Sequence, residues 1–270
     1  MQSETIGFIG AGQMATALTG GFLDKNLLAP TDLFAYDTNE TAQKKFLENY
    51  PQTTFVETSQ QLVEKASTII LAIKPQYLPD LLTEISSTCT SDKRLLSIAA
   101  GASLTQLEKA LPNARLIRAM PNTPCLIGEG ACGFSLGQKA TPDDKKVIER
   151  LLGAVGLSFE VAEPLLDTVT GLSGSGPAYI YQIIEALSDG GVQCGLPRTI
   201  ALQLAAQTVK GAAQMLLSTG LHPGQLKDNV ASPGGTTIAG LATMERHGVR
   251  GALIATVESA TSRAKELGAQ

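Results

Sequence analysis

The chain has 270 residues, 43% of them hydrophobic and 17% charged, with a formal net charge of −4 at pH 7. This length can bury one large or two ordinary domain cores, and the scattered lysines and arginines disfavour a nucleic-acid partner. No apolar stretch approaches the roughly 18 residues needed to span a bilayer, and no signal-peptide pattern precedes the first strand, so we expect a cytoplasmic globular protein without a membrane partner.

The chain opens on an apolar run that ends in a glycine-rich turn. Residues 5–9 are predicted to form a buried strand, and the turn Gly10-x-Gly12-x-x-Ala15 then leads into a helix. Gly10 permits the tight turn, Gly12 lets the backbone approach a pyrophosphate, and Ala15 lets the helix pack closely on the strand. Unpaired N–H groups at the helix N-terminus would hold the anion. The turn predicts a dinucleotide site, NADPH or NADH, with contacts from Gly10, Gly12, Gln13 and Met14.

Short apolar segments then alternate with helical ones, as in a doubly wound parallel sheet. The predicted strands are residues 33–36, 53–56, 68–73, 94–99 and 115–119, and the helices among them include 59–66, 78–86 and 104–111. Edge strands at 130–136 and 157–161 are expected around a helix at 142–152. Since strand C-terminal ends face the ligand crevice, the predicted cofactor contacts there are Ala72, Lys74, Pro75, Ala99, Gly101, Met120 and Asn122.

Some of these residues have alternative interpretations. Lys74 suits a cofactor phosphate or ribose, and equally a solvated surface position. Asn122 lies in a loop made rigid by two prolines, where its amide can hydrogen-bond the nicotinamide carboxamide. Asp37 follows the second strand, where a carboxylate can accept bonds from the adenosine ribose and would repel a 2′-phosphate. Asp37 and Glu40 also have capping-box spacing for the following helix.

Beyond Pro164 the sequence predicts only helices, at residues 177–194, 198–217, 223–230, 238–245 and 249–267. The predicted fold is therefore α/β, with a Rossmann dinucleotide-binding domain at 1–164 and an all-α dimerisation and substrate domain at 165–270. The first two helices are apolar on more than one face, so they require burial. A two-fold dimer is the simplest cover, and a monomer wrapped by its remaining helices is the alternative.

The chain has two histidines and four cysteines, and none fits a catalytic or metal pattern. His222 precedes a proline at a helix start, where capping or surface exposure is expected, and His247 lies at a helix C-terminus. The cysteines lack CxxC spacing and neighbouring histidines, so we expect reduced and mostly buried thiols. Reduction of a cyclic imine suits such a chain, because its basic nitrogen arrives protonated and needs mainly orientation.

Two glycine-rich segments begin helices in the second half. In residues 171–179, Ser175 is predicted to be an N-cap with Pro177 in the first turn. In residues 232–237, backbone N–H groups and three hydroxyls converge before Ile238. This second segment is suited to a small carboxylate.

With these residues in view, the chain resembles the pyrroline-5-carboxylate reductase family. The matching motifs run through nearly the whole chain: Gly7-Phe8-Ile9-Gly10-Ala11-Gly12-x-Met14-Ala15, Lys74-Pro75, Arg118-x-Met120-Pro121-Asn122-Thr123-Pro124, Gly171 to Tyr179, Asp189-Gly190-Gly191, Gly195-Leu196-Pro197-Arg198, His222-Pro223-Gly224-x-Leu226-Lys227-Asp228 and Ser232 to Ile238.

The resemblance implies NAD(P)H-dependent reduction of L-1-pyrroline-5-carboxylate to L-proline by a homodimer, with five dimers forming a decamer in many members. It implies that the substrate contacts are Thr170, Ser232, Gly235, Thr236 and Thr237. Thr237 is the predicted catalytic residue, bonding the ring nitrogen, and its loop would face the cofactor of the other subunit. Members that favour NADPH tend to have Ser, Asn or Arg where this chain has Asp37, which puts that preference in doubt.

Two other functions compete. A β-hydroxyacid dehydrogenase would share the two-domain plan but needs a catalytic lysine, for which Lys210 and Lys227 are the candidates. A non-enzymatic NAD(P)-binding regulator would keep only the Rossmann half. The substrate loop at 232–237 argues against the regulator.

Overall fold

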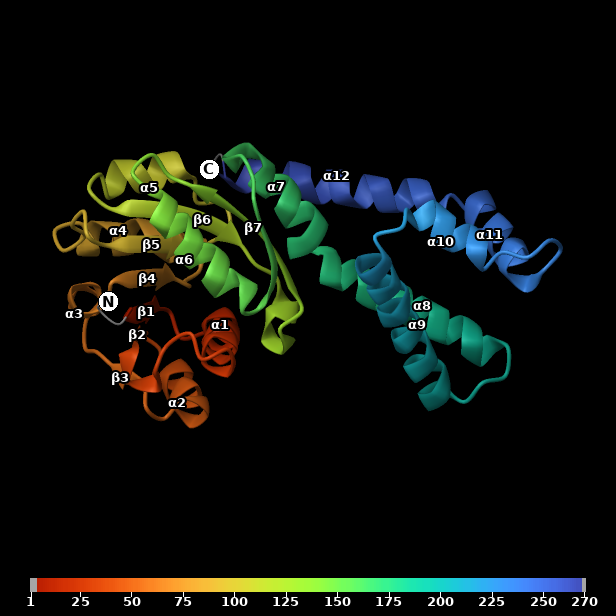
Figure 1. The fold of residues 1–270 in the computed structure, drawn as a ribbon, viewed down its shortest axis with the longest axis horizontal. Coiled ribbons are helices and arrows are strands. Elements are labelled where there is room, and N and C mark those ends of the chain that lie inside the picture. The colour runs from red at the N-terminus through yellow and green to blue at the C-terminus, as the bar shows by residue number, and fades with distance from the viewer. Residues whose placement is uncertain (1–3, 269–270) are drawn as a thin grey trace. The chain divides into compact units, whose positions relative to one another are not determined.

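The computed structural model describes residues 4–268 (Figure 1). The chain packs as two compact units, the first formed by Met1–Ser175 with Glu258–Gln270 and the second by Gly176–Val257. Residues 165–175 and the end of the last helix thus pack with the first unit, although the sequence assigns them to the helical domain.

Within the described residues, the first unit contains an eight-stranded sheet in the order β3-β2-β1-β4-β5-β6-β7-β8. Only the β6 and β7 pairing is antiparallel. The chain order reverses between β1 and β4, and at such a switch point an α/β sheet opens a crevice beyond its strand ends. The strands are β1 (Ile6–Ile9), β2 (Leu33–Tyr36), β3 (Thr54–Phe55), β4 (Thr68–Leu71), β5 (Arg94–Ser97), β6 (Arg115–Met120), β7 (Gly130–Leu136) and β8 (Gly156–Glu160).

Helices cover both faces of this sheet because its strands alternate apolar side chains between the two faces. Phe8 and Ile70 pack with one core cluster, which contains side chains of α1, α2 and α6. Ile9 and Ile69 pack with the other, which contains side chains of α3, α4 and α5. The helices are α1 (Gln13–Asp24), α2 (Glu40–Asn49), α3 (Ser59–Lys65), α4 (Leu78–Ile85), α5 (Leu104–Ala110) and α6 (Pro142–Gly153). The predicted α/β fold of this half is confirmed.

The chain leaves the sheet through a helical segment that the sequence did not predict. The short helix α7 (Leu166–Val169) continues into a π-helical turn, Thr170–Gly174. The Ser175 N–H donates to the Thr170 carbonyl, five residues back, at 2.8 Å. As predicted, Ser175 directly precedes α8 and Pro177 lies in its first turn, but the Ser175 backbone is already helical and continues the π-turn.

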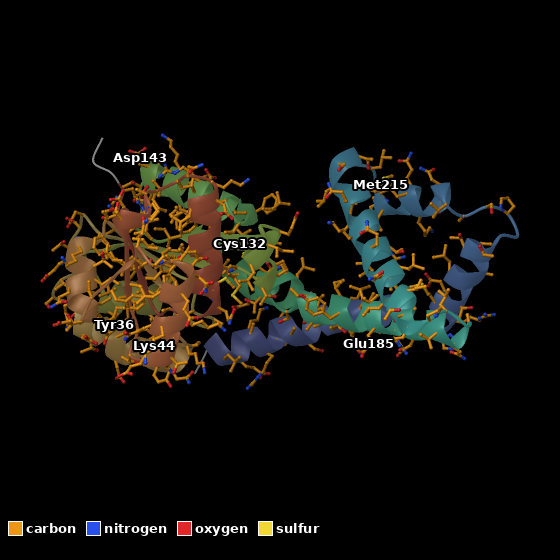
Figure 2. The ribbon with its side chains drawn as sticks, turned by 90° about the horizontal axis from the view of Figure 1, so that it is seen from below. Tyr36, Lys44, Cys132, Asp143, Glu185 and Met215 are labelled. Carbon is orange, nitrogen blue, oxygen red and sulfur yellow. The ribbon has the colours of Figure 1, made fainter. Side chains whose placement is uncertain are left out.

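The second unit is helical, as predicted. It contains α8 (Gly176–Gln193), α9 (Arg198–Thr219), α10 (Pro223–Asn229), α11 (Thr236–Arg246) and the start of α12 (Val249–Gly268). The helices α8 and α9 pack where Gly191 faces Ala201, which is 3% exposed. Other apolar side chains of this pair are exposed, among them Met215 of α9 (Figure 2). None of the helices within residues 4–268 has the length and apolar character needed to span a bilayer.

Candidate active site

The glycine-rich turn lies between the end of β1 and the start of α1. Gly10 has φ of 100°, and its N–H donates to the Tyr36 carbonyl at 2.8 Å. A Cβ at Gly10 would lie 2.5 Å from the Ala72 carbonyl oxygen, so a larger residue would force β1 and β4 apart. Gly12 is the N-cap of α1 and lacks a side-chain cap, and a Cβ there would meet nothing within 4 Å. Open space therefore adjoins the helix N-terminus, as a pyrophosphate requires.

Asp37 closes this turn from the end of β2. Its Oδ2 accepts a hydrogen bond from the Ala11 N–H at 2.8 Å, and its Oδ1 accepts one from the Asn39 N–H at 2.8 Å. The N-cap of α2 is Asn39, whose side chain accepts from the Ala42 N–H. The capping-box alternative for Asp37 and Glu40 is therefore wrong. Asp37 instead joins the glycine-rich turn to the start of α2.

A cavity of about 480 Å³ lies over this turn, beyond the ends of β1, β2 and β4. Five predicted cofactor residues line it, namely Gly10, Gly12, Asp37, Ala72 and Lys74. Tyr36 and Tyr77 also line it, together with Asp80 and Glu84 of α4, and sequence reasoning missed these four. Asp80 and Glu84 are four residues apart and so share one face of α4. That spacing predicts the shared face, while the packing of α4 against the sheet brings this face to the cavity.

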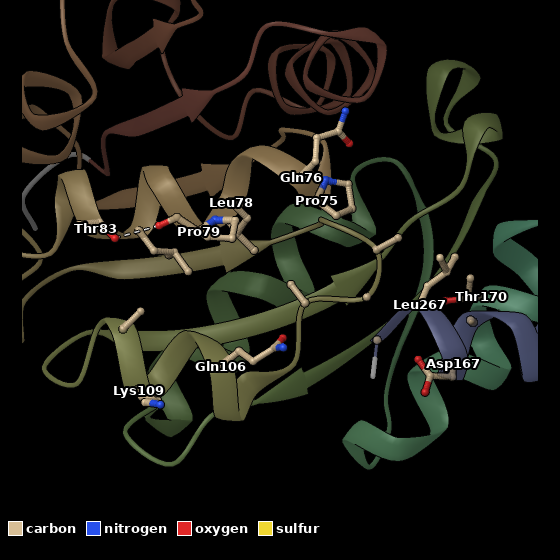
Figure 3. A pocket seen from close by; sticks show the side chains of 17 residues that line it. Pro75, Gln76, Leu78, Pro79, Thr83, Gln106, Lys109, Asp167, Thr170 and Leu267 are labelled. Carbon is tan, nitrogen blue, oxygen red and sulfur yellow. Dashed lines mark hydrogen bonds between the residues drawn. The ribbon is translucent and has the colours of Figure 1, made fainter. Parts of the chain in front are cut away.

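A second cavity, of about 1080 Å³, lies between α4 and α5 within the first unit (Figure 3). Its lining includes Pro75, Gly101 and Thr170, three predicted contacts. Gly101, in the turn between β5 and α5, has φ of 78°, a conformation that favours glycine. The Thr170 hydroxyl donates to the Leu166 carbonyl at 2.8 Å, which leaves its oxygen lone pairs available to a donor. The remaining predicted cofactor residues line neither cavity: Gln13, Met14, Ala99, Met120 and Asn122.

Met120 and Asn122 support the π-turn from the end of β6. The Asn122 Nδ2 donates to the Ser173 carbonyl at 2.9 Å, and its Oδ1 accepts from the Ala131 N–H at 2.9 Å. A Cβ at Gly174 would lie 3.1 Å from the Met120 Cε. Both ends of the Asn122 amide are thus bonded to backbone, so its contact with a nicotinamide stays a prediction.

In the second unit, the predicted substrate loop forms a turn before α11. The Gly235 N–H donates to the Ser232 carbonyl at 3.0 Å across Pro233 and Gly234, whose φ is 68°. This is the backbone of a type II turn, with proline and glycine in their preferred positions. Gly235 then serves as N-cap without any side-chain hydrogen bond. The first N–H groups of α11 are therefore left for an anion.

The histidines and most cysteines have structural positions. His222 caps α10 by accepting from the Gly224 N–H at 3.1 Å, as predicted, and His247 is the C-cap of α11. Cys89, Cys125 and Cys132 are buried and Cys194 is exposed, all as free thiols. Burial raises the pKa of Cys132 to about 12, so its thiol is protonated and unreactive at neutral pH. No group of three His, Cys, Asp or Glu residues in the described chain is arranged to hold a metal ion.

A mainly parallel sheet with this glycine-rich turn after its first strand, and with an acidic residue at the end of the second, defines the class of Rossmann-type dinucleotide-binding proteins. The pyrroline-5-carboxylate reductase of Glycine max is 43% identical to the chain, and the match covers 98% of this chain and 97% of the relative. The pyrroline-5-carboxylate reductase of Methanosarcina acetivorans is 44% identical, and the match covers 99% of each chain. The chain belongs to the pyrroline-5-carboxylate reductase family.

Family models and solved structures agree with this assignment. Residues 163–267 match the pyrroline-5-carboxylate reductase dimerisation family, and residues 5–101 match the family described as NADP oxidoreductase, coenzyme F420-dependent. A pyrroline-5-carboxylate reductase from Coxiella burnetii superposes with a TM-score of 0.91 at 34% identity, covering 98% of this chain and 99% of its own. The Plasmodium falciparum pyrroline carboxylate reductase, solved with NADP bound, gives 0.88 at 32% identity and covers 99% of both chains.

Proposed function

We propose that the protein reduces L-1-pyrroline-5-carboxylate to L-proline with NAD(P)H. The observation that carries this proposal is the start of α11, where a Ser232–Gly235 turn precedes a helix N-terminus without a side-chain cap. Such a terminus binds a small carboxylate, which is the anionic group of this imine. The relatives that support the reaction extend over nearly the whole chain.

The chain's own residues would position the reactants. The turn at Gly10 and Gly12 and the α1 N-terminus hold the dinucleotide pyrophosphate, and the bound dinucleotide supplies the hydride. Ser232, Gly235 and Thr236 hold the substrate carboxylate, while the Thr237 hydroxyl bonds the ring nitrogen and Thr170 contacts the ring. A protonated imine needs no side-chain acid, which agrees with histidines used as helix caps.

Residues 163–267 match a dimerisation family. A homodimer would complete the active site, with the 232–237 loop of one protomer facing the cofactor of its partner. Assembly of five dimers into a decamer extends the proposal, and light scattering would measure it. The free thiols support a cytoplasmic location, because disulfides do not persist in that compartment.

The test of the reaction is NAD(P)H oxidation by the purified protein. We expect turnover with pyrroline-5-carboxylate and none with a β-hydroxyacid and the oxidised cofactor. Activity on the hydroxyacid without activity on the imine would overturn the proposal in favour of the dehydrogenase alternative.

The sharper test is Thr237→Ala. Loss of the bond to the ring nitrogen should lower kcat/KM by about 2 to 3 kcal/mol in activation free energy, whereas Thr237→Ser should retain most of the activity. Thr243→Ala is the matched control, because that hydroxyl donates to Ala239 within the same helix. An unchanged kcat/KM in Thr237→Ala would remove this residue from the mechanism.

A further inference from the structure

The cavity over the glycine-rich turn is lined by more acidic than basic side chains. Three carboxylates line it, those of Asp37, Asp80 and Glu84, and Lys74 is the cation among its described lining residues. Lys44, on the neighbouring helix α2, pairs with Glu40 at 3.9 Å and does not line the cavity. The charge of the lining therefore opposes a second anionic group of a ligand.

The carboxylates of Asp37 and Glu84 both lie close enough to Tyr36 to act on its phenol electrostatically. Burial raises the pKa of the Tyr36 phenol, and the negative charges of Glu84 and Asp37 raise it further. Tyr36 ends β2 and is next to Asp37 in the chain. Glu84 approaches from α4, where its Oε1 accepts a hydrogen bond from the Ser59 hydroxyl at 2.7 Å. The field of both carboxylates is therefore directed at the end of β2.

Asp37 also occupies the backbone donors at this end of the cavity. Its two oxygens bind the N–H groups of Ala11 and Asn39, each at 2.8 Å. The Asn39 side-chain oxygen is used in turn to cap α2. A phosphate placed here would have to displace a carboxylate from these N–H groups. The ribose hydroxyls, by contrast, can donate to the second lone pairs of the same carboxylate.

We propose that this cavity selects NADH over NADPH, through carboxylate repulsion from Asp37 and Glu84 together with Asp37 occupancy of the Ala11 and Asn39 N–H groups. The two cofactors differ in the 2′-phosphate of the adenosine ribose, and a phosphate monoester carries about −1.5 to −2 charges at pH 7. Lys74, which is exposed to solvent, is the cation that this lining offers the phosphate, and the Thr38 hydroxyl, the Asn39 amide and the Tyr36 and Tyr77 phenols are neutral donors. The proposal rests on the cofactor site of the proposed reductase, and it assigns the coenzyme of that reaction.

The test is calorimetric titration of the purified protein with NADH and with NADPH, without the imine. We expect NADH to bind at least about tenfold more tightly at low ionic strength. Added salt should narrow this ratio, because screening weakens repulsion. NADPH binding as tight as NADH binding, or a ratio that widens with salt, would overturn the proposal, since a widening ratio means that cations attract the phosphate.

Two variants separate the charge from the occupied donors. Glu84→Gln keeps an acceptor for Ser59 and removes one charge, so NADPH binding should tighten about two- to threefold with NADH binding nearly unchanged. Asp37→Ser also frees the Ala11 and Asn39 N–H groups, so it should lower the NADPH-to-NADH ratio of Kd values further. The control is Glu64→Gln, an exposed acid of α3 outside the cavity lining. Ratios unmoved in both cavity variants would overturn the assignment.

These measurements separate the two proposals. NADH-selective binding without imine reduction would leave the selectivity standing and reject the reductase reaction. Imine reduction together with tighter binding of NADPH than of NADH would support the reductase reaction and reject the selectivity for NADH.

Discussion

Asp144 ties together strands and a helix at the end of the sheet opposite the cofactor cavity. The residue is the N3 position of α6, and its Oδ2 accepts from the Thr141 N–H and hydroxyl. Its Oδ1 accepts from Arg94 and Arg115, each at 2.7 Å, at the starts of β5 and β6. The carboxylate is 0% exposed. A buried, fully bonded carboxylate of this kind specifies where α6 begins and where the two strands lie.

Removing this charge should therefore destabilise the first unit. Asp144→Asn takes the carboxylate from the buried Arg94, which keeps its pairing with Glu4, and from the partly buried Arg115. We expect the unfolding free energy to fall by about 2 kcal/mol. Denaturant titration measures the change. Asp143→Asn is the control, because that neighbour is exposed and pairs with Lys146 within the same helix. Equal stability of the two variants would contradict a structural role for the ion cluster.

The pH dependence of stability follows from the same residue. Burial alone would raise the pKa of Asp144, but hydrogen bonds from Thr141 and Arg94 outweigh it and lower that pKa below the usual 3.8. Because the folded-state value is the lower one, the stabilisation is fully present above about pH 4 and is lost as pH falls through the folded-state pKa. The acid limb of a stability curve should be shallower in Asp144→Asn than in the wild type.

At the scale of elements, local sequence patterns predicted the strands, the long helices and the glycine-rich turn. They succeed because periodicity and the Gly10 spacing are set by nearby residues. They did not predict the π-turn at Thr170–Gly174, where the glycine and serine content suggested only a helix start. They also failed to find Glu84, because its position at the cavity depends on how α4 packs against the sheet. Asp37 follows the second strand, as predicted. Its hydrogen bond with Ala11 joins residues 26 apart in the chain, so no local pattern could indicate it.

The Asn122 amide ties the π-turn to the residues that follow β6, which gives a test. In Asn122→Asp, the Nδ2 donor to the Ser173 carbonyl becomes an acceptor, so two oxygens face each other in a site that is 7% exposed. We expect a loss of about 1 to 3 kcal/mol of unfolding free energy. The matched control is Asn49→Asp, whose exposed amide bonds within α2. A loss no greater than that of the control would show that the turn holds its shape without Asn122.

At the scale of the whole molecule, the helices α8 and α9 leave apolar side chains exposed on one protomer. Tyr181 and Leu217 are each 63% exposed, and Leu204 near the middle of α9 is 53% exposed. A monomer that covered these helices with its remaining ones would have buried such side chains, so the wrapped-monomer alternative is wrong. Exposed apolar patches of this kind mark interaction surfaces, in agreement with the dimerisation family.

The uncovered face predicts how the dimer should respond to a buried charge. Leu204→Lys loses apolar burial and places an unpaired cation in the dimer contact. The free energy of dimerisation should weaken by about 3 kcal/mol, which raises the dissociation constant of the dimer more than about a hundredfold. Gln203→Lys adds the same charge at the neighbouring exposed polar position, which is turned about 100° around the helix from Leu204, and serves as control. Sedimentation analysis against protein concentration measures both.

If the 232–237 loop serves the partner's cofactor, reductase activity of Leu204→Lys should fall on dilution together with the dimer fraction, while dinucleotide binding by the separate protomers persists. Activity that stays constant through dissociation would place a complete active site within one chain.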